Sequence, residues 1–198
     1  MKKNKITSTP ILPELWCNDQ IGWASIPKNA NMATRRVMTA LGAPRHHYDE
    51  ETPENLFCVI RDPRQRVIAG IGEYQRRSKT VPDTTDLKRL LLDFIYDPEP
   101  FDEHVEPQCC FIDHVTHKIT HVCRFESLVA DMLTVPGLTE SVVTEFIIEP
   151  KLSQSKTGDI AALVKKHRAL VDKCIKQYYT VDMDIFESAN PLSIINQL

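Results

Sequence analysis

The sequence lacks any long apolar run: no stretch approaches the roughly 20 consecutive apolar residues that a membrane-spanning helix needs. Residues 1–16, MKKNKITSTPILPELW, begin with basic residues but contain no apolar core long enough for a signal peptide. We therefore expect a cytoplasmic protein. With 198 residues, of which 42% are hydrophobic and 26% charged, the chain is long enough for one globular domain with a buried core.

A strong net charge is also missing. The formal charge is −3, which argues against a general nucleic-acid-binding protein. Two local basic clusters exist, QRRSK at 75–79 and KKHR at 165–168. Such clusters are usually solvated helix faces, and the alternative is that one of them meets an acidic substrate.

Cysteine pairs with C-x-x-C spacing are absent as well. The cysteines are therefore expected to be free thiols, as in a reducing compartment. The segment HVTHKITHVC at 114–123 holds three histidines and one cysteine, but its second half resembles a strand, which would separate these side chains. We therefore expect no metal site. The six cysteines are Cys17, Cys58, Cys109, Cys110, Cys123 and Cys174.

Short apolar segments alternate with amphipathic ones along the chain, without internal repeats or low-complexity linkers. This order predicts one domain, 1–198, with residues 1–20 as an N-terminal extension. It also predicts an α/β fold with a largely parallel sheet. Strands are expected at 21–26, 56–60 and 119–125, and helices from about 30 to Gly42, from 63, at 86–95, at about 126–133 and at 160–178, with 139–148 open between helix and strand.

The helix after the second strand has a well-marked start. Asp62 is a natural N-cap, Pro63 suits the first helical position, and Gln65 completes the pattern of a capping box. The helix is therefore predicted to begin at Pro63.

Two predicted strands each end near a cation, Lys28 after IGWASIP and Arg61 after LFCVI. In parallel sheets, ligands bind beyond the carboxyl ends of the strands, so both cations would face one crevice if the strands are neighbours. A strand-to-helix loop also offers backbone N–H groups to an anion. The alternatives are a surface lysine on an ordinary turn and an arginine paired with Asp62. The segment PKNANMATRR contains no glycine and does not match the Walker A pattern.

These segments resemble a known family. IPKNANMATRR followed by VIRDPRQRVIAGI is similar to the paired signature of sulfotransferases that use 3′-phosphoadenosine 5′-phosphosulfate (PAPS), closest to carbohydrate sulfotransferases and their short bacterial and viral relatives. FDEHVEPQCCFID resembles a further block, D-x-H-x-x-P-Q, and HVCRFESL and YYTVDMDIF resemble later segments. The resemblance spans Trp23 to about Phe186. It implies a P-loop-like three-layer fold with a central, mainly parallel sheet flanked by helices.

The resemblance also implies roles for particular residues. Arg61 would bind the 3′-phosphate of PAPS, and Ser155 and Lys156 lie where related enzymes place a late loop near the nucleotide. Lys28 would stabilise the charge that develops on the leaving phosphate oxygen. The 5′-phosphosulfate would be held by Lys28, Asn29, Ala30, Asn31, Met32, Ala33 and Thr34.

The chain departs from the family pattern at two places. Family members usually carry a hydroxyl residue in the middle of the first loop, where this chain has Met32 and Ala33, with Thr34 nearby. The family's serine eight residues after the arginine is replaced by Ala69. Each loss removes a hydrogen bond to a charged group, worth about 1.5–3 kcal/mol.

The general base remains open between three histidines. His46 and His47 precede the second strand, where related glycan sulfotransferases can carry their base, and His104 belongs to the D-x-H-x-x-P-Q block. Some relatives use a carboxylate instead, and the candidates for this are Glu50, Glu51 and Glu103.

The sequence therefore predicts a PAPS-dependent sulfotransferase that acts on a hydroxyl group, with a carbohydrate or glycolipid as the acceptor. Two alternatives stay open: a nucleotide-binding but catalytically impaired relative, and a phosphoryl transferase. The latter would need a magnesium-binding hydroxyl after the loop lysine, where this chain has Asn29. In the sulfotransferase reaction, PAPS would be converted to adenosine 3′,5′-bisphosphate.

Overall fold

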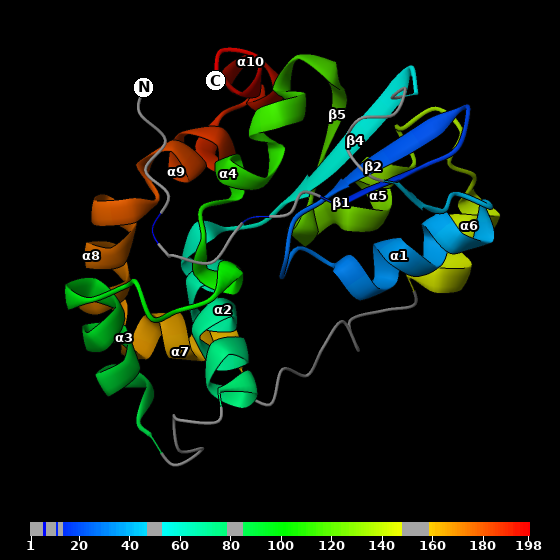
Figure 1. The fold of residues 1–198 in the computed structure, drawn as a ribbon. Coiled ribbons are helices and arrows are strands. Elements are labelled where there is room, and N and C mark those ends of the chain that lie inside the picture. The colour runs from blue at the N-terminus through cyan, green and yellow to red at the C-terminus, as the bar shows by residue number, and fades with distance from the viewer. Residues whose placement is uncertain (1–5, 7–10, 12–13, 47–52, 79–84, 148–158) are drawn as a thin grey trace.

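The computed structural model describes residues 6, 11, 14–46, 53–78, 85–147 and 159–198 (Figure 1). Within these residues a sheet of five strands has the order β3-β1-β2-β4-β5. The parallel pairs are β2–β4 and β4–β5, whereas β1 is antiparallel to both of its neighbours, so four strands run in one direction. The predicted mainly parallel sheet is confirmed. The strands are β1 Glu14–Cys17, β2 Ile21–Ser25, β3 Arg45–His46, β4 Asn55–Ile60 and β5 Ile119–Arg124.

Helices cover both faces of the sheet, which gives a three-layer α/β fold (Figure 1). One face packs against α1, α5 and α6, and the other against α4, η2, α9 and α10. The helices are α1 Asn31–Ala40, α2 Pro63–Arg77, α3 Leu87–Tyr96, α4 Gln108–Ile112, α5 Leu128–Met132, α6 Glu140–Phe146, α7 Ile160–Lys166, α8 Arg168–Tyr178, α9 Thr180–Glu187 and α10 Pro191–Ile195, and the 3₁₀ turns are η1 Glu103–Val105, η2 Asp113–Lys118 and η3 Phe125–Ser127.

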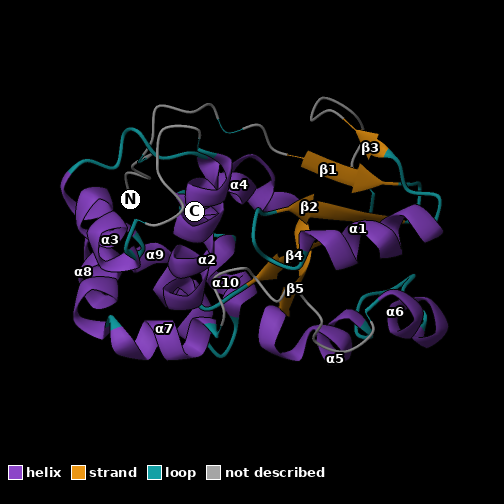
Figure 2. Ribbon diagram, turned by 90° about the horizontal axis from the view of Figure 1, so that it is seen from below, coloured by secondary structure: helices purple, strands orange, loops and turns teal. Residues whose placement is uncertain are grey.

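Strand β4, which lies between β2 and β5, is apolar at nearly every position because both of its faces are buried. Phe57 and Val59 belong to the core on the α1 side, whereas Leu56, Cys58 and Ile60 belong to the core on the α4 side. Successive side chains of a strand point to opposite faces, so a strand covered on both sides needs a continuous apolar run. Helices α2, α3, α7 and α8 form a further helical group beside the sheet (Figure 2).

Most of the predicted elements are confirmed, and 139–148 contains the helix α6. The prediction of one long helix at 160–178 is wrong. The chain breaks at His167, where φ is −109° and ψ is 23°, and forms α7 and α8. The two halves differ in their packing: α7 packs on α2, whereas α8 packs on both α3 and α2. A one-residue break leaves the apolar periodicity almost intact, so the pattern could not reveal it.

Residues 14–17, which the sequence analysis assigned to an N-terminal extension, form the strand β1. Leu15 and Cys17 are buried, and the strand pairs with both β2 and β3. Four residues are too few for a reliable alternating pattern. None of the described helices is both long enough and apolar enough to cross a membrane.

Candidate anion-binding site

The loop between β2 and α1 has an unusual backbone. Lys28 and Ala30 adopt left-handed conformations, with φ of 69° and 60°, although neither is glycine. The left-handed region costs a residue with a side chain roughly 1–2 kcal/mol. Helix α1 begins at Asn31, directly after this loop, so its N-terminus and its dipole face the same region.

Buried side chains hold three successive residues of this loop. The Nε of Arg66 donates to the carbonyl of Pro27 at 3.2 Å, and the Nη1 of Arg61 donates to the carbonyl of Lys28 at 3.2 Å. The Nδ2 of Asn29 donates to the carbonyl of Val59 at 2.7 Å. These hydrogen bonds offset the backbone strain and explain how the loop keeps its shape without glycine.

The second cation lies at the end of the neighbouring strand. Strands β2 and β4 are adjacent and parallel, with Ala24 opposite Cys58, so their carboxyl ends meet at one edge of the sheet. The condition that the sequence analysis set, that these two strands are neighbours, is therefore met. Lys28 and Arg61, which are 33 positions apart in sequence, are joined directly by the hydrogen bond from Arg61 to the Lys28 carbonyl.

Arg61 is 6% exposed and is held on several sides. Its guanidinium carbon lies 4.3 Å from the centre of the Phe125 ring, and its Nη2 donates to Gln65 Oε1 at 3.3 Å. Burial lowers the pKa of Arg61, and the nearby carboxylate of Glu126 opposes this shift. Stacking on an aromatic face suits a guanidinium, which is weakly hydrated.

The start of α2 at Pro63 is confirmed, with Asp62 accepting a hydrogen bond from the Arg64 amide at 2.9 Å. The predicted capping box is not formed, however. The backbone N–H of Asp62 donates instead to Glu126 Oε1 at 3.1 Å, and the side chain of Gln65 turns to Arg61. A carboxylate distant in sequence thus satisfies the donor that the local pattern assigned to Gln65.

The ammonium group of Lys28 forms an ion pair with Glu73 on α2, at 3.0 Å. Arg76 and Arg77 also bind this carboxylate, and the Nε of Arg77 lies 2.7 Å from it. The hydrogen bond from Arg76 is the main cause that lowers the pKa of Glu73 far below its usual value, with further contributions from Lys28 and Arg77, whereas burial opposes the shift.

We expect Glu73→Gln to remove a pH-dependent part of the stability. A lowered pKa in the folded state means that the carboxylate stabilises the protein above its unfolded pKa of 4.5 and that this contribution disappears as the pH falls. The variant should be about 1 kcal/mol less stable at pH 7, with a difference that shrinks toward pH 2. Urea unfolding across this range measures it. The exposed Glu145→Gln is the control, and a pH-independent difference for Glu73→Gln would contradict the prediction.

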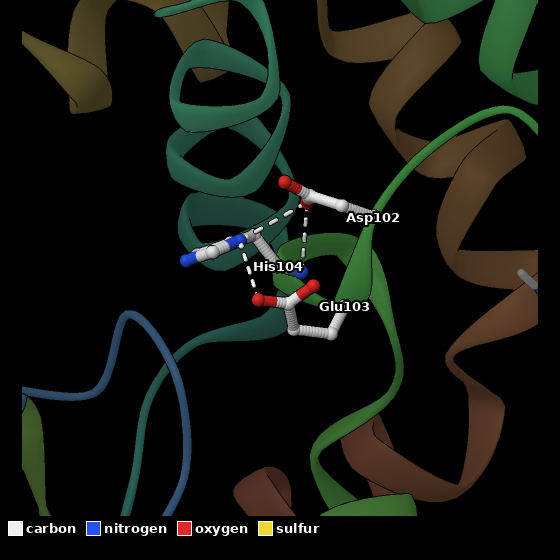
Figure 3. Close-up of side chains that lie close together, drawn as sticks. All are labelled: Asp102, Glu103 and His104. Atoms are coloured by element: carbon white, nitrogen blue, oxygen red, sulfur yellow. Dashed lines mark hydrogen bonds and ion pairs between the residues drawn. The ribbon is translucent and has the colours of Figure 1, made fainter. Parts of the chain in front are cut away.

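His104 lies in the turn η1 and is buried, with 7% of its surface exposed. Its Nδ1 is 3.0 Å from the Asp102 carboxylate and 3.6 Å from that of Glu103 (Figure 3). A carboxylate accepts hydrogen bonds, so Nδ1 is the donor, and in the neutral form of the ring the lone pair is on Nε2. Nε2 points away from both carboxylates in Figure 3. Gly70 of α2 packs against the His104 carbonyl, where any Cβ would overlap the oxygen.

A continuous series of side-chain contacts connects His104 with Lys28. Lys28 pairs with Glu73, Glu73 with Arg77, and Arg77 with Glu103 at 3.7 Å. Glu103 in turn contacts the His104 ring. The structure thus brings His104 and Lys28 into one charged cluster.

Of the other two candidate histidines, one lies away from the Lys28 loop and one is outside the described residues. His46 is in β3, opposite Leu15, and β1 separates that strand from β2. His47 lies outside the described residues, as do Glu50 and Glu51 and the late-loop residues Ser155 and Lys156.

The remaining cofactor-binding candidates divide into exposed and buried positions. Met32, in the first turn of α1, is 67% exposed, whereas Ala33, Thr34 and Ala69 are buried. The hydroxyl that could replace the family's loop hydroxyl, that of Thr34, therefore lies inside the protein. Among the described residues it has no hydrogen-bond partner, and the same holds for other buried polar atoms near the loop: Asn29 Oδ1, Asn31 Oδ1, Arg61 Nε and Arg66 Nη2.

Three buried residues that the sequence analysis did not single out support this site: Arg66, Gln108 and Asp182. Arg66 is fully buried, donates to the carbonyls of Pro27 and Glu106, and lies 5.6 Å from the Phe111 ring centre. Burial lowers the pKa of Arg66 and raises the pKa of Asp182, while their opposite charges counteract both shifts. All three residues fall inside the quoted family-like segments, which was the available signal.

Comparisons with known proteins returned no matches: neither a family model, nor a curated protein, nor a solved structure matches this chain.

Proposed function

We propose that this protein is a sulfotransferase that transfers the sulfuryl group of PAPS to a hydroxyl group of a carbohydrate or glycolipid. The observation that carries the proposal is the meeting of two cationic strand ends. Lys28 follows β2, Arg61 follows β4, and the two strands are parallel neighbours. A ligand with two separate anionic groups matches this arrangement, and PAPS carries a 5′-phosphosulfate and a 3′-phosphate.

The residues present are compatible with such a ligand. The left-handed loop and the N-terminus of α1 favour an anion next to Lys28. The planar fork of Arg61 can bind a phosphate through two hydrogen bonds, and its Nε is buried without a partner among the described residues. In this proposal Lys28 holds the 5′-phosphosulfate and Arg61 the 3′-phosphate.

The proposed reaction is a direct displacement at sulfur. The acceptor oxygen forms a bond with sulfur while the bond between sulfur and the bridging phosphate oxygen breaks, and the acceptor proton passes to a base. The products are a sulfate ester and adenosine 3′,5′-bisphosphate. Negative charge grows on the bridging oxygen, so an ammonium group there stabilises the transition state more than the ground state.

His104 is the base that we assign. Asp102 holds its ring in the tautomer that leaves the Nε2 lone pair able to accept a proton. The contacts through Glu103, Arg77 and Glu73 connect it with Lys28. A carboxylate that orients the ring and a chain of contacts to the cation of the site both support this assignment.

We expect His104→Asn to lower turnover by about 10²–10⁴-fold, the usual contribution of a general base. The base acts on the acceptor hydroxyl, which is not part of adenosine 3′,5′-bisphosphate. The affinity for this product should therefore change by less than about threefold, or about 0.7 kcal/mol. Sulfation assays and calorimetric titration measure the two quantities. His46→Asn and His47→Asn serve as comparisons. A large loss of turnover in either of them, with activity retained in His104→Asn, would reassign the base.

Thermal shift measurements test the proposed ligand itself. A ligand that binds only the folded state raises the melting temperature, so adenosine 3′,5′-bisphosphate at 100 times its Kd should stabilise the protein by about 2.7 kcal/mol. AMP should give a smaller shift because it lacks the 3′-phosphate. A shift with ATP and magnesium but none with the bisphosphate would refute the proposal. Asn29, which follows Lys28, argues for the expected outcome because it supplies no hydroxyl group to bind magnesium, and its Nδ2 donates to the Val59 carbonyl and to Gln108 Oε1.

A further inference from the structure

Gln108, the first residue of α4, makes hydrogen bonds to both strand ends of the site. Its Oε1 accepts from the Nδ2 of Asn29 at 2.5 Å and from the backbone N–H of Arg61 at 2.8 Å. Its Nε2 donates to the backbone carbonyl of Arg61 at 2.9 Å. One oxygen atom therefore joins the loop that follows β2 to the residue that follows β4.

The contact with Arg61 resembles strand pairing. The side-chain amide of Gln108 satisfies both the N–H and the C=O of Arg61, the two groups that a neighbouring strand would bind. Arg61 is the first residue beyond β4, so the Gln108 amide extends the hydrogen-bonding pattern of this strand by one residue. The direction of the Arg61 side chain depends on its backbone, and so does the hydrogen bond from Arg61 to the Lys28 carbonyl.

Gln108 is itself held firmly in place. Its backbone N–H donates to Asp182 Oδ2 at 2.6 Å, and that of Cys109 donates to Asp182 Oδ1 at 3.0 Å. Asp182 belongs to α9 and is 1% exposed, and Gln108 is 2% exposed. The carboxylate thus satisfies the N-terminal amides of α4 and anchors the helix that carries Gln108.

We propose that Gln108 is a positioning residue that keeps the two anion-binding strand ends at the spacing of one ligand with two anionic groups. It would not touch the ligand, since its amide is already engaged by Asn29 and Arg61. Glutamine suits this place because a single side chain must both accept from two donors and donate to a carbonyl. The part of the inference that concerns PAPS rests on the proposed function, whereas the coupling of the two loops does not.

Gln108→Met tests the inference, because methionine has a similar length and removes all three side-chain hydrogen bonds. Val171→Ala is the matched control: Val171 is fully buried in α8, outside this network, so its truncation destabilises the fold without touching the site. Hydrogen exchange is measured on peptides that cover 26–34 and 58–66. Titration with adenosine 3′,5′-bisphosphate gives the affinity, and the kinetics give KM for PAPS and kcat separately.

In Gln108→Met we expect faster exchange in both peptides, an affinity for the bisphosphate at least tenfold weaker, and a KM for PAPS that rises more than kcat falls. Val171→Ala should leave the exchange of both peptides and the affinity within about twofold of the wild-type values, or about 0.4 kcal/mol. A double variant that combines Asn29→Ala with Gln108→Met is also measured. Its affinity for the bisphosphate should lie within threefold of that of Gln108→Met alone, because Gln108→Met already removes the bond between the two side chains.

Three results would overturn the inference: faster exchange in only one of the two peptides, exchange no faster than in Val171→Ala, or an unchanged affinity despite faster exchange in both. If the wild-type protein binds no bisphosphate, the proposed function fails, and the exchange of the two peptides still decides whether Gln108 couples them.

Discussion

Replacing Lys28 by alanine should lower the turnover of sulfation by about 10²–10³-fold, the usual cost of removing one preorganised group that stabilises a developing oxyanion. The backbone of Lys28 is held in a left-handed conformation, and its carbonyl is fixed by Arg61. These contacts involve the main chain, so they persist in the variant. The side-chain loss therefore removes the ammonium group while the loop stays in place.

The effect on stability should be small by comparison. The side chain of Lys28 is 27% exposed, and among the described residues it forms an ion pair with Glu73 alone. Loss of this pair leaves the Glu73 carboxylate bound to Arg76 and Arg77. Partly exposed ion pairs contribute about 0–1 kcal/mol. Lys28→Arg keeps the charge and should retain part of the turnover. The exposed Lys165→Ala is the control for loss of a lysine elsewhere. Sulfation by Lys28→Ala at nearly the wild-type rate would exclude the role that we assign to this residue.

Arg61→Ala should instead act mainly on binding. A hydrogen bond to a charged group is worth about 1.5–3 kcal/mol, so the Kd for adenosine 3′,5′-bisphosphate should rise by about 10–150-fold. Lysine cannot reproduce the planar fork, and Arg61→Lys should therefore recover only part of the affinity. Calorimetric titration measures both variants, with the exposed Arg36→Ala of α1 as the control.

Comparison of two ligands makes the Arg61 prediction specific. Arg61 also bonds the Lys28 carbonyl and Gln65, so its loss disturbs the loop as well as the proposed 3′-phosphate contact. AMP lacks the 3′-phosphate, and its affinity should change far less than that of the bisphosphate. An equal loss for both ligands would show that Arg61 acts through the loop alone and would contradict its assignment to the 3′-phosphate.

The charged side chains around Lys28 share their partners. Glu73 contacts three cations, and the Glu103 carboxylate contacts both Arg77 and His104. Partners shared in this way couple the residues, so the effects of two substitutions within the cluster should not add. Double variants of Lys28 and Glu73 therefore have to be compared with both single variants.

Local sequence was sufficient where a signal spans only a few residues. The start of α2 at Pro63 followed from Asp62 and Pro63, and the apolar run at 56–60 identified a strand buried on both faces. The cations Lys28 and Arg61 could be placed at strand ends for the same reason. N-caps, proline and apolar periodicity act between near neighbours in the chain, so a sequence displays them directly.

Tertiary structure alone decided what those strand ends contact. The bonds from Lys28 to Glu73, from Asn29 to Gln108 and from Gln108 to Asp182 span 45, 79 and 74 positions. No local pattern specifies such partners, because they depend on the order of the strands and on which helices cover each face. The sequence thus identified two cations at strand ends as candidates for anion binding. The parallel packing of β2 against β4, with partners from α2 and α4, brought these strand ends together.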